Sequence, residues 1–107
     1  MLPIDPPAIL EVNEKREYVR VNESACKLLG YTREELLQMR IDDLSFPSGA
    51  HVSPMFERYQ EDGGLRGIFA VKSKRGEVLW IRYDAVVEDG RMISRWTEYE
   101  TLPQAET

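Results

Sequence analysis

Two helix starts follow one another in residues 21–36, which read VNESACKLLGYTREEL. Asn22 is a good helix N-cap because its side-chain oxygen can accept a hydrogen bond from a free amide of the first turn. Gly30 can end that helix, since glycine adopts the left-handed conformation of a helix end at little cost. The apolar residues between the two caps share one face of the helix: Ala25, Leu28 and Leu29. We therefore predict a short amphipathic helix between Asn22 and Gly30.

The second start is a capping box at residues 32–35, which read TREE. The Thr32 hydroxyl can accept from the amide of Glu35, and the Glu35 carboxylate can accept from the amide of Thr32. Tyr31 and Leu36 stand on either side, where a hydrophobic staple holds a helix start in place. Each such cap stabilises a helix by about 1 kcal/mol.

Two further helices are predicted before residue 65. Residues 41–44, IDDL, form a single short turn. Ser53 and Pro54 supply a cap and a proline at the first helical position, which start a longer helix. The glycine pair at 63–64 ends that helix.

Alternating apolar residues predict strands on both sides of these helices. Residues 9–12 and 18–21 flank a polar turn and form a hairpin. Residues 65–73, 78–87 and 92–99 follow the helices and form an antiparallel meander. This order of elements predicts an α+β domain, with one sheet and the helices folded over one of its faces.

The strand at residues 78–87 has two distinct faces. Every second residue is apolar, and these residues form the core face: Leu79, Ile81, Tyr83, Ala85 and Val87. The opposite face carries Trp80 and Val86 among charged residues.

Both ends of the chain are predicted to lie outside the domain. Residues 1–8 contain three prolines, which do not fit a helix or a central strand, so we interpret this segment as an N-terminal arm. Residues 101–107 are predicted to be a C-terminal tail or a linker. Residues 9–100 are then a single domain of common size.

The composition of the 107 residues excludes several classes of protein. Fourteen basic and nineteen acidic residues give a net charge of −5, which argues against a nucleic acid partner because phosphate binding needs a basic face. The longest apolar runs have four residues, whereas a membrane span needs about 20. One cysteine and one histidine form neither an internal disulfide nor a His/Cys metal cluster, and the single thiol indicates the cytoplasm.

Residues 21–36 resemble the first-helix signature of PAS sensor domains, with a strand ending in Val-Asn, then Leu-Leu-Gly-Tyr and a capped Glu-Glu-Leu helix. Residues 74–81, KRGEVLWI, are similar to the basic-glycine hairpin and the Trp-bearing strand of that family. Trp96-Thr97-Glu98 is similar to part of its closing motif. The resemblance covers residues 9–100 and implies a five-stranded antiparallel sheet in the order 2-1-5-4-3, with short helices on one face.

The resemblance also implies a sensory module with no catalytic activity of its own. Such domains bind a small ligand between helices and sheet, or a partner protein, and pass a signal to a kinase, a cyclase or a transcription factor, as in two-component regulation. An effector of this kind then lies in a longer chain or in a partner, because residues 1–107 contain none. Two departures from the family stand out: residues 45–51 lack its His-Pro-x-Asp run, and Arg95 replaces the Asp that couples the sheet to a downstream helix.

Two cofactors known in this family are disfavoured by the residues of this chain. Flavin photosensors of this family carry a reactive cysteine just after the capped helix, and Ile41 stands at that place, while Cys26 lies in the first helix. No covalent flavin adduct is therefore expected. Haem sensors of the family use a histidine on the helix that Ser53 starts here, whereas His51 precedes that cap, so haem binding through His51 is a remote alternative.

Any ligand is expected to be mostly apolar, because few polar groups converge between the predicted helices and the sheet. The candidate cavity residues come from the helices and the three later strands: Leu44, Met55, Tyr59, Phe69, Val71, Ile81, Tyr83 and Ile93. No catalytic residue is assigned, since Asp42 and Asp43 are neighbours that point in different directions and form no acid–base pair.

The outer sheet face carries an apolar patch around a Trp, and such a patch is seldom left in water. Either the N-terminal arm around Leu2 and Ile4 covers it or a second subunit does, and we favour a homodimer through this face. Its candidate residues are Leu2, Ile4, Ile68, Ala70, Trp80 and Val86. The alternative to the ligand-binding sensor is accordingly a ligand-free module for homodimerisation or other protein interactions.

The facing of Trp96 depends on the turn before it. A two-residue turn at Asp89-Gly90 places Trp96 beside Tyr83 on the core face. A three-residue turn with a bulge at Gly90 places Ile93 inside and Trp96 outside. The family pattern favours the second register.

Overall fold

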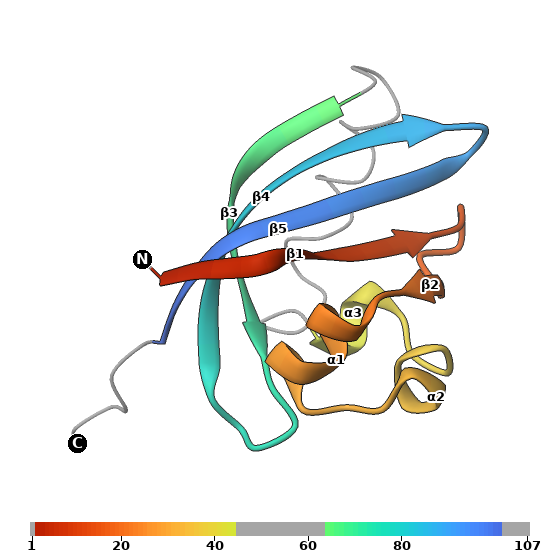
Figure 1. Ribbon diagram of the computed structural model, residues 1–107. Helices are drawn as coiled ribbons and strands as arrows, with labels where there is room; N and C mark the ends of the chain where they lie inside the picture. Colours follow the sequence, from red (N-terminus) through yellow and green to blue (C-terminus); the bar gives the residue numbers. More distant parts are fainter. Residues whose placement is uncertain (1, 45–63, 102–107) are drawn as a thin grey trace.

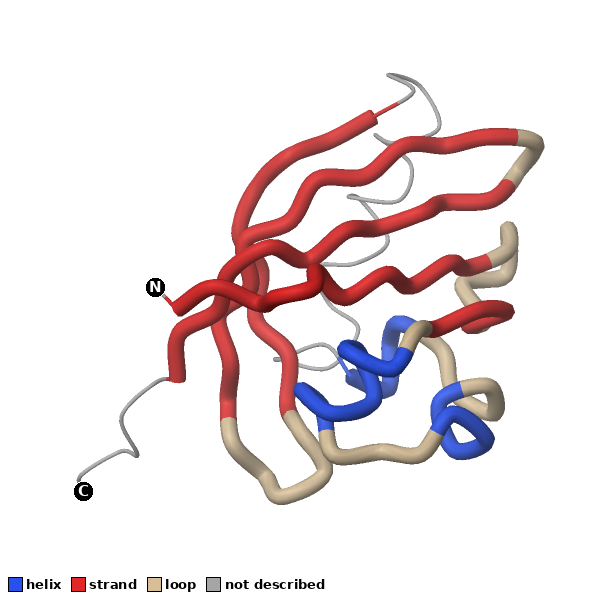
Figure 2. The backbone as a smooth tube through the Cα atoms, viewed as in Figure 1, coloured by secondary structure: helices blue, strands red, loops and turns tan. Residues whose placement is uncertain are grey.

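The structure is a computed structural model that describes residues 2–44 and 64–101 (Figure 1). The elements in chain order are β1 (Leu2–Val12), β2 (Tyr18–Val21), α1 (Glu23–Leu29), α2 (Arg33–Leu36), α3 (Ile41–Leu44), β3 (Gly64–Lys72), β4 (Val78–Glu88) and β5 (Arg91–Thr101). The strands form one antiparallel sheet in the order β2-β1-β5-β4-β3, and the helices gather on one side of it (Figure 2). The predicted fold class and strand order are confirmed. The helix predicted from Ser53 lies outside the described residues.

Both predicted helix caps are present. The Asn22 side-chain oxygen accepts from the amide of Ala25 at 3.1 Å, and Gly30 ends α1 in the left-handed conformation, with φ at 81°. In α2 the Thr32 hydroxyl accepts from the amide of Glu35 at 3.1 Å, while the Glu35 carboxylate accepts from the amide of Thr32 at 2.9 Å. The predicted cap residues are therefore those at which α1 and α2 begin.

Asn22 also connects α1 to β1. Its side-chain oxygen accepts a second hydrogen bond, from the amide of Ile9 at 3.0 Å, and its amide group donates to the carbonyl of Pro7 at 3.0 Å. One side chain therefore holds the start of α1 against the middle of β1.

The segment predicted as an N-terminal arm belongs to the sheet. β1 begins at Leu2, and Leu2 and Pro3 pair with Tyr99 and Glu98 of β5. The prolines are tolerated for two reasons. β2 pairs with β1 only from Leu10 onward, so the earlier part of β1 has one neighbouring strand, and the pairing with β5 is irregular between Pro3 and Ala8.

The β3–β4 turn is anchored to the helices through Lys74. Its amide donates to the carbonyl of Leu29 at 2.9 Å, next to the end of α1. Its ammonium group lies 2.8 Å from the second oxygen of the Glu35 carboxylate and 5.8 Å from the centre of the Tyr31 ring. The far end of the β3–β4 hairpin is therefore fixed to the helical layer.

The core lies between the helices and one face of the sheet, which we call the inner face. Its helical residues include Ala25, Leu29, Leu36 and Leu44, and its strand residues include Leu10, Val12, Ile81 and Trp96. All of these side chains are almost fully buried. The alternation predicted for residues 78–87 is confirmed, since Leu79, Ile81, Tyr83 and Ala85 are buried and Trp80 and Val86 are exposed.

The β4–β5 turn has the two-residue form, so the favoured register was wrong. Glu88 pairs with Arg91, and both Asp89 and Gly90 have positive φ, at 50° and 76°. That conformation is the type I′ turn, which suits the right-handed twist of two adjoining strands.

This register decides the facing of two residues. Trp96 pairs with Tyr83 and is buried on the inner face, whereas Ile93 pairs with Val86 on the outer face. Ile93 is therefore not a cavity residue.

Candidate functional site

The inner face brings together most of the predicted cavity residues that the structure describes. Leu44 comes from α3, Phe69 and Val71 from β3, and Ile81 and Tyr83 from β4, and all of them lie in or against one apolar cluster. Met55 and Tyr59 lie outside the described residues, as does His51, the residue of the haem alternative.

Three aromatic rings form the centre of this face. The Phe69 ring meets the Tyr83 ring edge-to-face with 5.0 Å between centroids, and the Trp96 ring in the same manner at 5.4 Å. Such pairs contribute about 0.5–1.5 kcal/mol beyond the area they bury. Phe69 is half-buried, whereas Tyr83 and Trp96 are buried.

Trp96 is the site residue that the sequence reasoning missed. Its position follows from the Asp89-Gly90 dipeptide, a strong signal for a two-residue hairpin turn, because that turn fixes the facing of the β5 residues as far as Trp96, after which the register shifts.

The side chains packed around the aromatic cluster are mostly apolar. The Trp96 indole donates to the Ser94 hydroxyl at 2.9 Å, so that polar pair is satisfied within β5. Gly67 lies beneath the Tyr83 ring, and a Cβ added there would lie 3.4 Å from the Tyr83 hydroxyl. A ligand in contact with these rings would be recognised through apolar and aromatic surface.

The carboxyl groups near α3 serve structural roles. Asp42 pairs with Arg16 at 3.2 Å, and Asp43 accepts from the amide of Arg40 at 2.8 Å at the start of α3. Burial raises the pKa of the Cys26 thiol above its usual range, which keeps it neutral and weakly nucleophilic. Burial, with help from Asp43, raises the pKa of Tyr18 as well.

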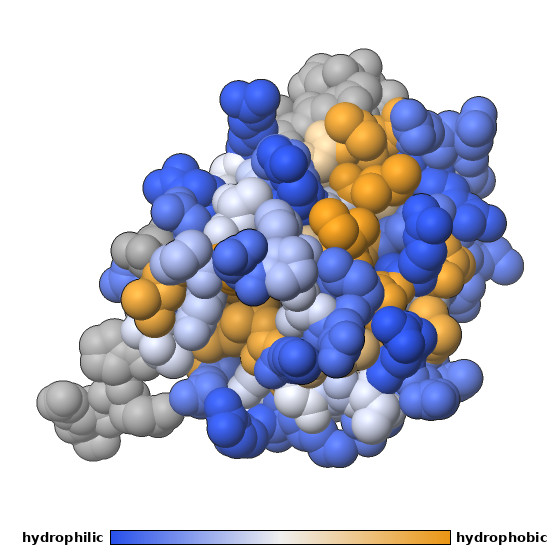
Figure 3. Space-filling view, viewed as in Figure 1, coloured by the Kyte–Doolittle hydropathy of each residue, from blue (hydrophilic) through white to orange (hydrophobic). Residues whose placement is uncertain are grey.

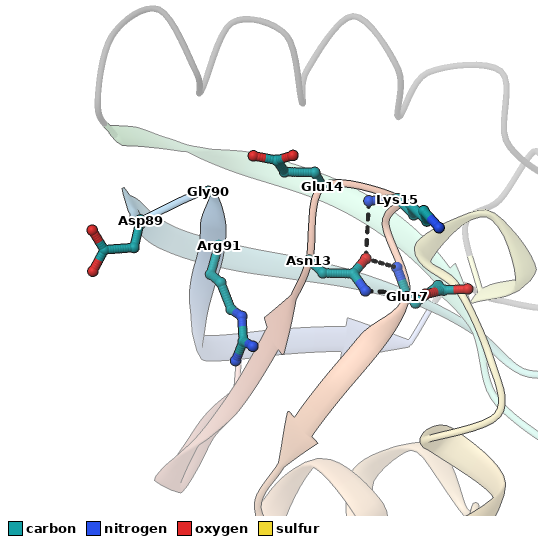
Figure 4. A pocket seen from close by; sticks show the side chains of 7 residues that line it. All are labelled: Asn13, Glu14, Lys15, Glu17, Asp89, Gly90 and Arg91. Carbon is teal, nitrogen blue, oxygen red and sulfur yellow. Dashed lines mark hydrogen bonds between the residues drawn. The ribbon is translucent and has the colours of Figure 1, made fainter.

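Two open grooves lie away from the aromatic cluster. One, of about 310 Å³, lies between the β1–β2 and β4–β5 turns (Figure 4). Within it the Asn13 side-chain oxygen accepts from the amides of Lys15 and Glu17 at 2.9 and 3.0 Å. The other, of about 360 Å³, lies between β2 and the α2–α3 connection. In the first groove, the two hydrogen bonds to Asn13 close the β1–β2 turn, so this side chain has a structural role.

The outer sheet face carries the exposed apolar residues of the predicted interface. Ile68, Trp80 and Val86 are 48%, 37% and 46% exposed. Figure 3 shows apolar residues gathered over the halves of β4 and β5 that lead to their shared turn. Between these residues stand the ion pairs of Arg95 with Asp84 and of Arg82 with Glu98.

The other predicted interface residues lie elsewhere. Ala70 pairs with Trp80 on the outer face but is buried, and Ile4 is buried in the core. Leu2 is exposed, but it pairs with Tyr99, whose other neighbour is the inner residue Ile81. Paired residues share a face, so Leu2 lies on the inner side and does not cover Trp80.

The sequence profile that matches this chain is described as a PAS domain and covers residues 6–94. Among solved structures, a domain of a sensory box sensor histidine kinase/response regulator from Geobacter sulfurreducens is 25% identical, with a TM-score of 0.75 over 86% of this chain and 82% of that one. The PAS domain of an HTR-like protein from Haloarcula marismortui is 17% identical, with a TM-score of 0.74 over 91% and 82%.

A third similar structure is the PAS domain, in complex with ethanol, of a LuxR-family transcriptional regulator from Burkholderia thailandensis. It is 19% identical, with a TM-score of 0.71 over 91% of this chain and 89% of that one. No curated protein sequence matches the chain significantly. Within the described residues, no helix is both long and apolar enough to cross a membrane.

Proposed function

Because the chain belongs to the PAS domain family, we propose that it is a sensory input module that binds a small, mostly apolar ligand and has no catalytic activity of its own. The signal would pass to an effector such as a kinase or a transcription factor. The occurrence of a similar domain in a sensor histidine kinase supports this role. The lone cysteine supports a cytoplasmic location.

The aromatic cluster of Phe69, Tyr83 and Trp96 carries the ligand proposal. It combines a half-buried ring with two buried ones on the inner face, and such surfaces suit small apolar or aromatic molecules. The ethanol complex of the Burkholderia thailandensis domain gives a precedent for a small, weakly polar ligand on this fold.

The two tryptophans provide a test within one molecule. Titration with indole and with short-chain alcohols, followed by NMR, is expected to shift the indole N–H signal of Trp96 and leave that of Trp80 in place. Phe69→Ala should change the affinity, whereas Ile68→Ala on the outer face should not. Equal shifts of both indole signals, or no shift of either, would contradict the proposed site.

The exposed apolar residues of the outer face favour a second candidate function, homodimerisation. Ile68, Trp80 and Val86 leave apolar surface in water on one side of the sheet. Trp80→Asp is expected to weaken self-association and to leave the circular dichroism spectrum unchanged. A wild-type protein that stays monomeric in light scattering at high concentration would rule this candidate out.

A further inference from the structure

The outer edge of β3 has no neighbouring strand among the residues that the structure describes. β3 is the last strand of the sheet, and in the part of the chain that the structure describes only β4 pairs with it, from Gly64 to Lys72 (Figure 1). A free edge of this length is a template for another extended segment, and proteins often protect such edges with charges or prolines. The described part of β3 contains no proline.

The backbone groups that face the open side can be identified from the turn. The Ser73 amide donates to the Glu77 carbonyl at 2.9 Å, so the Ser73 backbone points toward the β4 side. Backbone direction alternates along an antiparallel strand. The residues whose N–H and C=O groups point away from β4 are therefore Arg66, Ile68, Ala70 and Lys72.

The same four residues direct their side chains to the outer face. They form a row that we call the edge row, with a cation at each end and two apolar residues between. Arg66, Ile68 and Lys72 are exposed, and Ala70 is buried beside Trp80.

The two cations of the edge row have no carboxylate partner within residues 2–44 and 64–101. Neither Arg66 nor Lys72 forms an ion pair with another described residue. Asp84 is the cross-strand neighbour of Arg66, but the Arg95 guanidinium holds that carboxylate at 3.0 Å. On the other strands of this face the cations are paired, as in Arg82 with Glu98 at 2.8 Å. The excess positive charge of the face is therefore at its open edge.

We propose that the edge of β3 binds an extended acidic segment of a partner protein, which adds to the sheet as a sixth strand. The partner's backbone would pair with the free groups of the edge row, an established mode of peptide recognition. Its side chains would follow the pattern acidic-x-apolar-x-apolar-x-acidic, with carboxylates opposite Arg66 and Lys72 and an apolar residue opposite Ile68. Opposite charges on paired residues stabilise a ladder by about 0.2–1 kcal/mol each.

The charges favour this partner over a second copy of the chain. Two copies paired through the same edge would bring Arg66 and Lys72 of both onto one face with no carboxylate in either row. Like charges close together across a ladder are destabilising.

The test uses the purified chain and the synthetic peptide Ser-Glu-Thr-Val-Thr-Val-Thr-Glu-Ser, with a matched peptide in which Lys replaces each Glu. Calorimetry should show binding of the acidic peptide only, and hydrogen exchange should show new protection of the Ile68 and Ala70 amides. Failure of the acidic peptide to bind at about millimolar concentration, or equal binding of both peptides, would overturn the proposal.

Matched variants separate the contribution of the edge-row charges to peptide binding from that of the backbone hydrogen bonds. The double variant Arg66→Glu/Lys72→Glu should weaken binding by about tenfold or more. The control Lys15→Glu/Lys27→Glu, which changes the net charge equally but lies away from β3, should bind as the wild type does. Ala70→Pro removes one outward amide without touching the β3–β4 ladder and should abolish binding while the thermal transition is retained. Wild-type binding by the double variant, or protection of the β3 amides by self-association alone, would also refute the acidic partner.

Discussion

Trp96 on β5 and Trp80 on β4 lie on opposite faces of one sheet, and their side chains are 2% and 37% exposed. The Trp96 ring is held by Phe69 and by the Ser94 hydroxyl, whereas on the outer face charged pairs alternate with exposed apolar residues. The inner face thus depends on packing, and the outer face leaves surface available for partners. Substitutions on the inner face should mainly affect folding, and those on the outer face should mainly affect association.

The largest effect is expected for Trp96→Ala. Loss of a buried indole removes apolar contacts and leaves a cavity beside Phe69, which should lower the free energy of unfolding by about 3–5 kcal/mol. Trp80→Ala, the matched control, should lower it by about 1 kcal/mol or less because that side chain is partly solvated. Chemical denaturation measures both. Similar losses of unfolding free energy in the two variants would show that the two faces do not differ in their contribution to stability.

Asn22→Ala should have the next largest effect, about 2 kcal/mol, because it removes a helix cap and two hydrogen bonds to β1 together. Thr32→Ala removes only the α2 cap and should lose about 1 kcal/mol. Urea denaturation of both variants gives the comparison. A loss for Asn22→Ala no greater than for Thr32→Ala would mean that the bonds to β1 add no stability.

Glu11 is the exception on the outer face, since its side chain is only 8% exposed and accepts from both Arg91 and Arg20 at 2.9 Å. The hydrogen bond from Arg91 is the main reason that the pKa of Glu11 lies below its usual 4.5. Glu11→Gln should therefore cost about 1–2 kcal/mol at neutral pH.

The pH dependence of that loss follows from the direction of the pKa shift. The stabilising contribution of Glu11 is present above pH 4.5 and disappears as the pH falls through its lowered folded pKa. The difference in unfolding free energy between wild type and Glu11→Gln should shrink over the same range. A difference that does not shrink as the pH is lowered from 4.5 through the acidic range would contradict the assigned ion pairs.

The smallest effect is expected for Asp84→Asn on the open part of the outer face. The Arg95–Asp84 pair has side chains 55% and 36% exposed, and such pairs contribute about 0–1 kcal/mol. Thermal unfolding at low and at high salt should show little change. A loss as large as that of Glu11→Gln would show that exposure does not separate the two ion pairs.

The helical layer was the easiest part to predict, because Asn22 and Thr32 act through hydrogen bonds within three residues. The β1 pairing was harder to predict. Whether Pro3 fits a strand depends on β5, which begins far along the chain, and on where β2 stops. The sequence of residues 1–8 by itself therefore does not show that this segment joins the sheet.

The prediction of which side chains face inward was correct where strand alternation alone decides it. It was wrong where a turn intervenes. Ile81 and Tyr83 lie within a single strand, so their facing follows from period two. Trp96 and Ile93 follow the Asp89-Gly90 turn, where one residue more or less reverses the facing of the side chains between the turn and the register shift after Trp96. The family pattern outweighed the local turn chemistry there and gave the wrong face.

The anchoring of Lys74 has a mechanical consequence for the two layers. Separation of helices and sheet at that end must break a backbone hydrogen bond to Leu29 and an ion pair to Glu35 in the same movement. Because Glu35 also caps α2, pulling the β3–β4 turn outward would strain the first turn of that helix. A displacement of the hairpin tip and the fraying of α2 should therefore occur as one event.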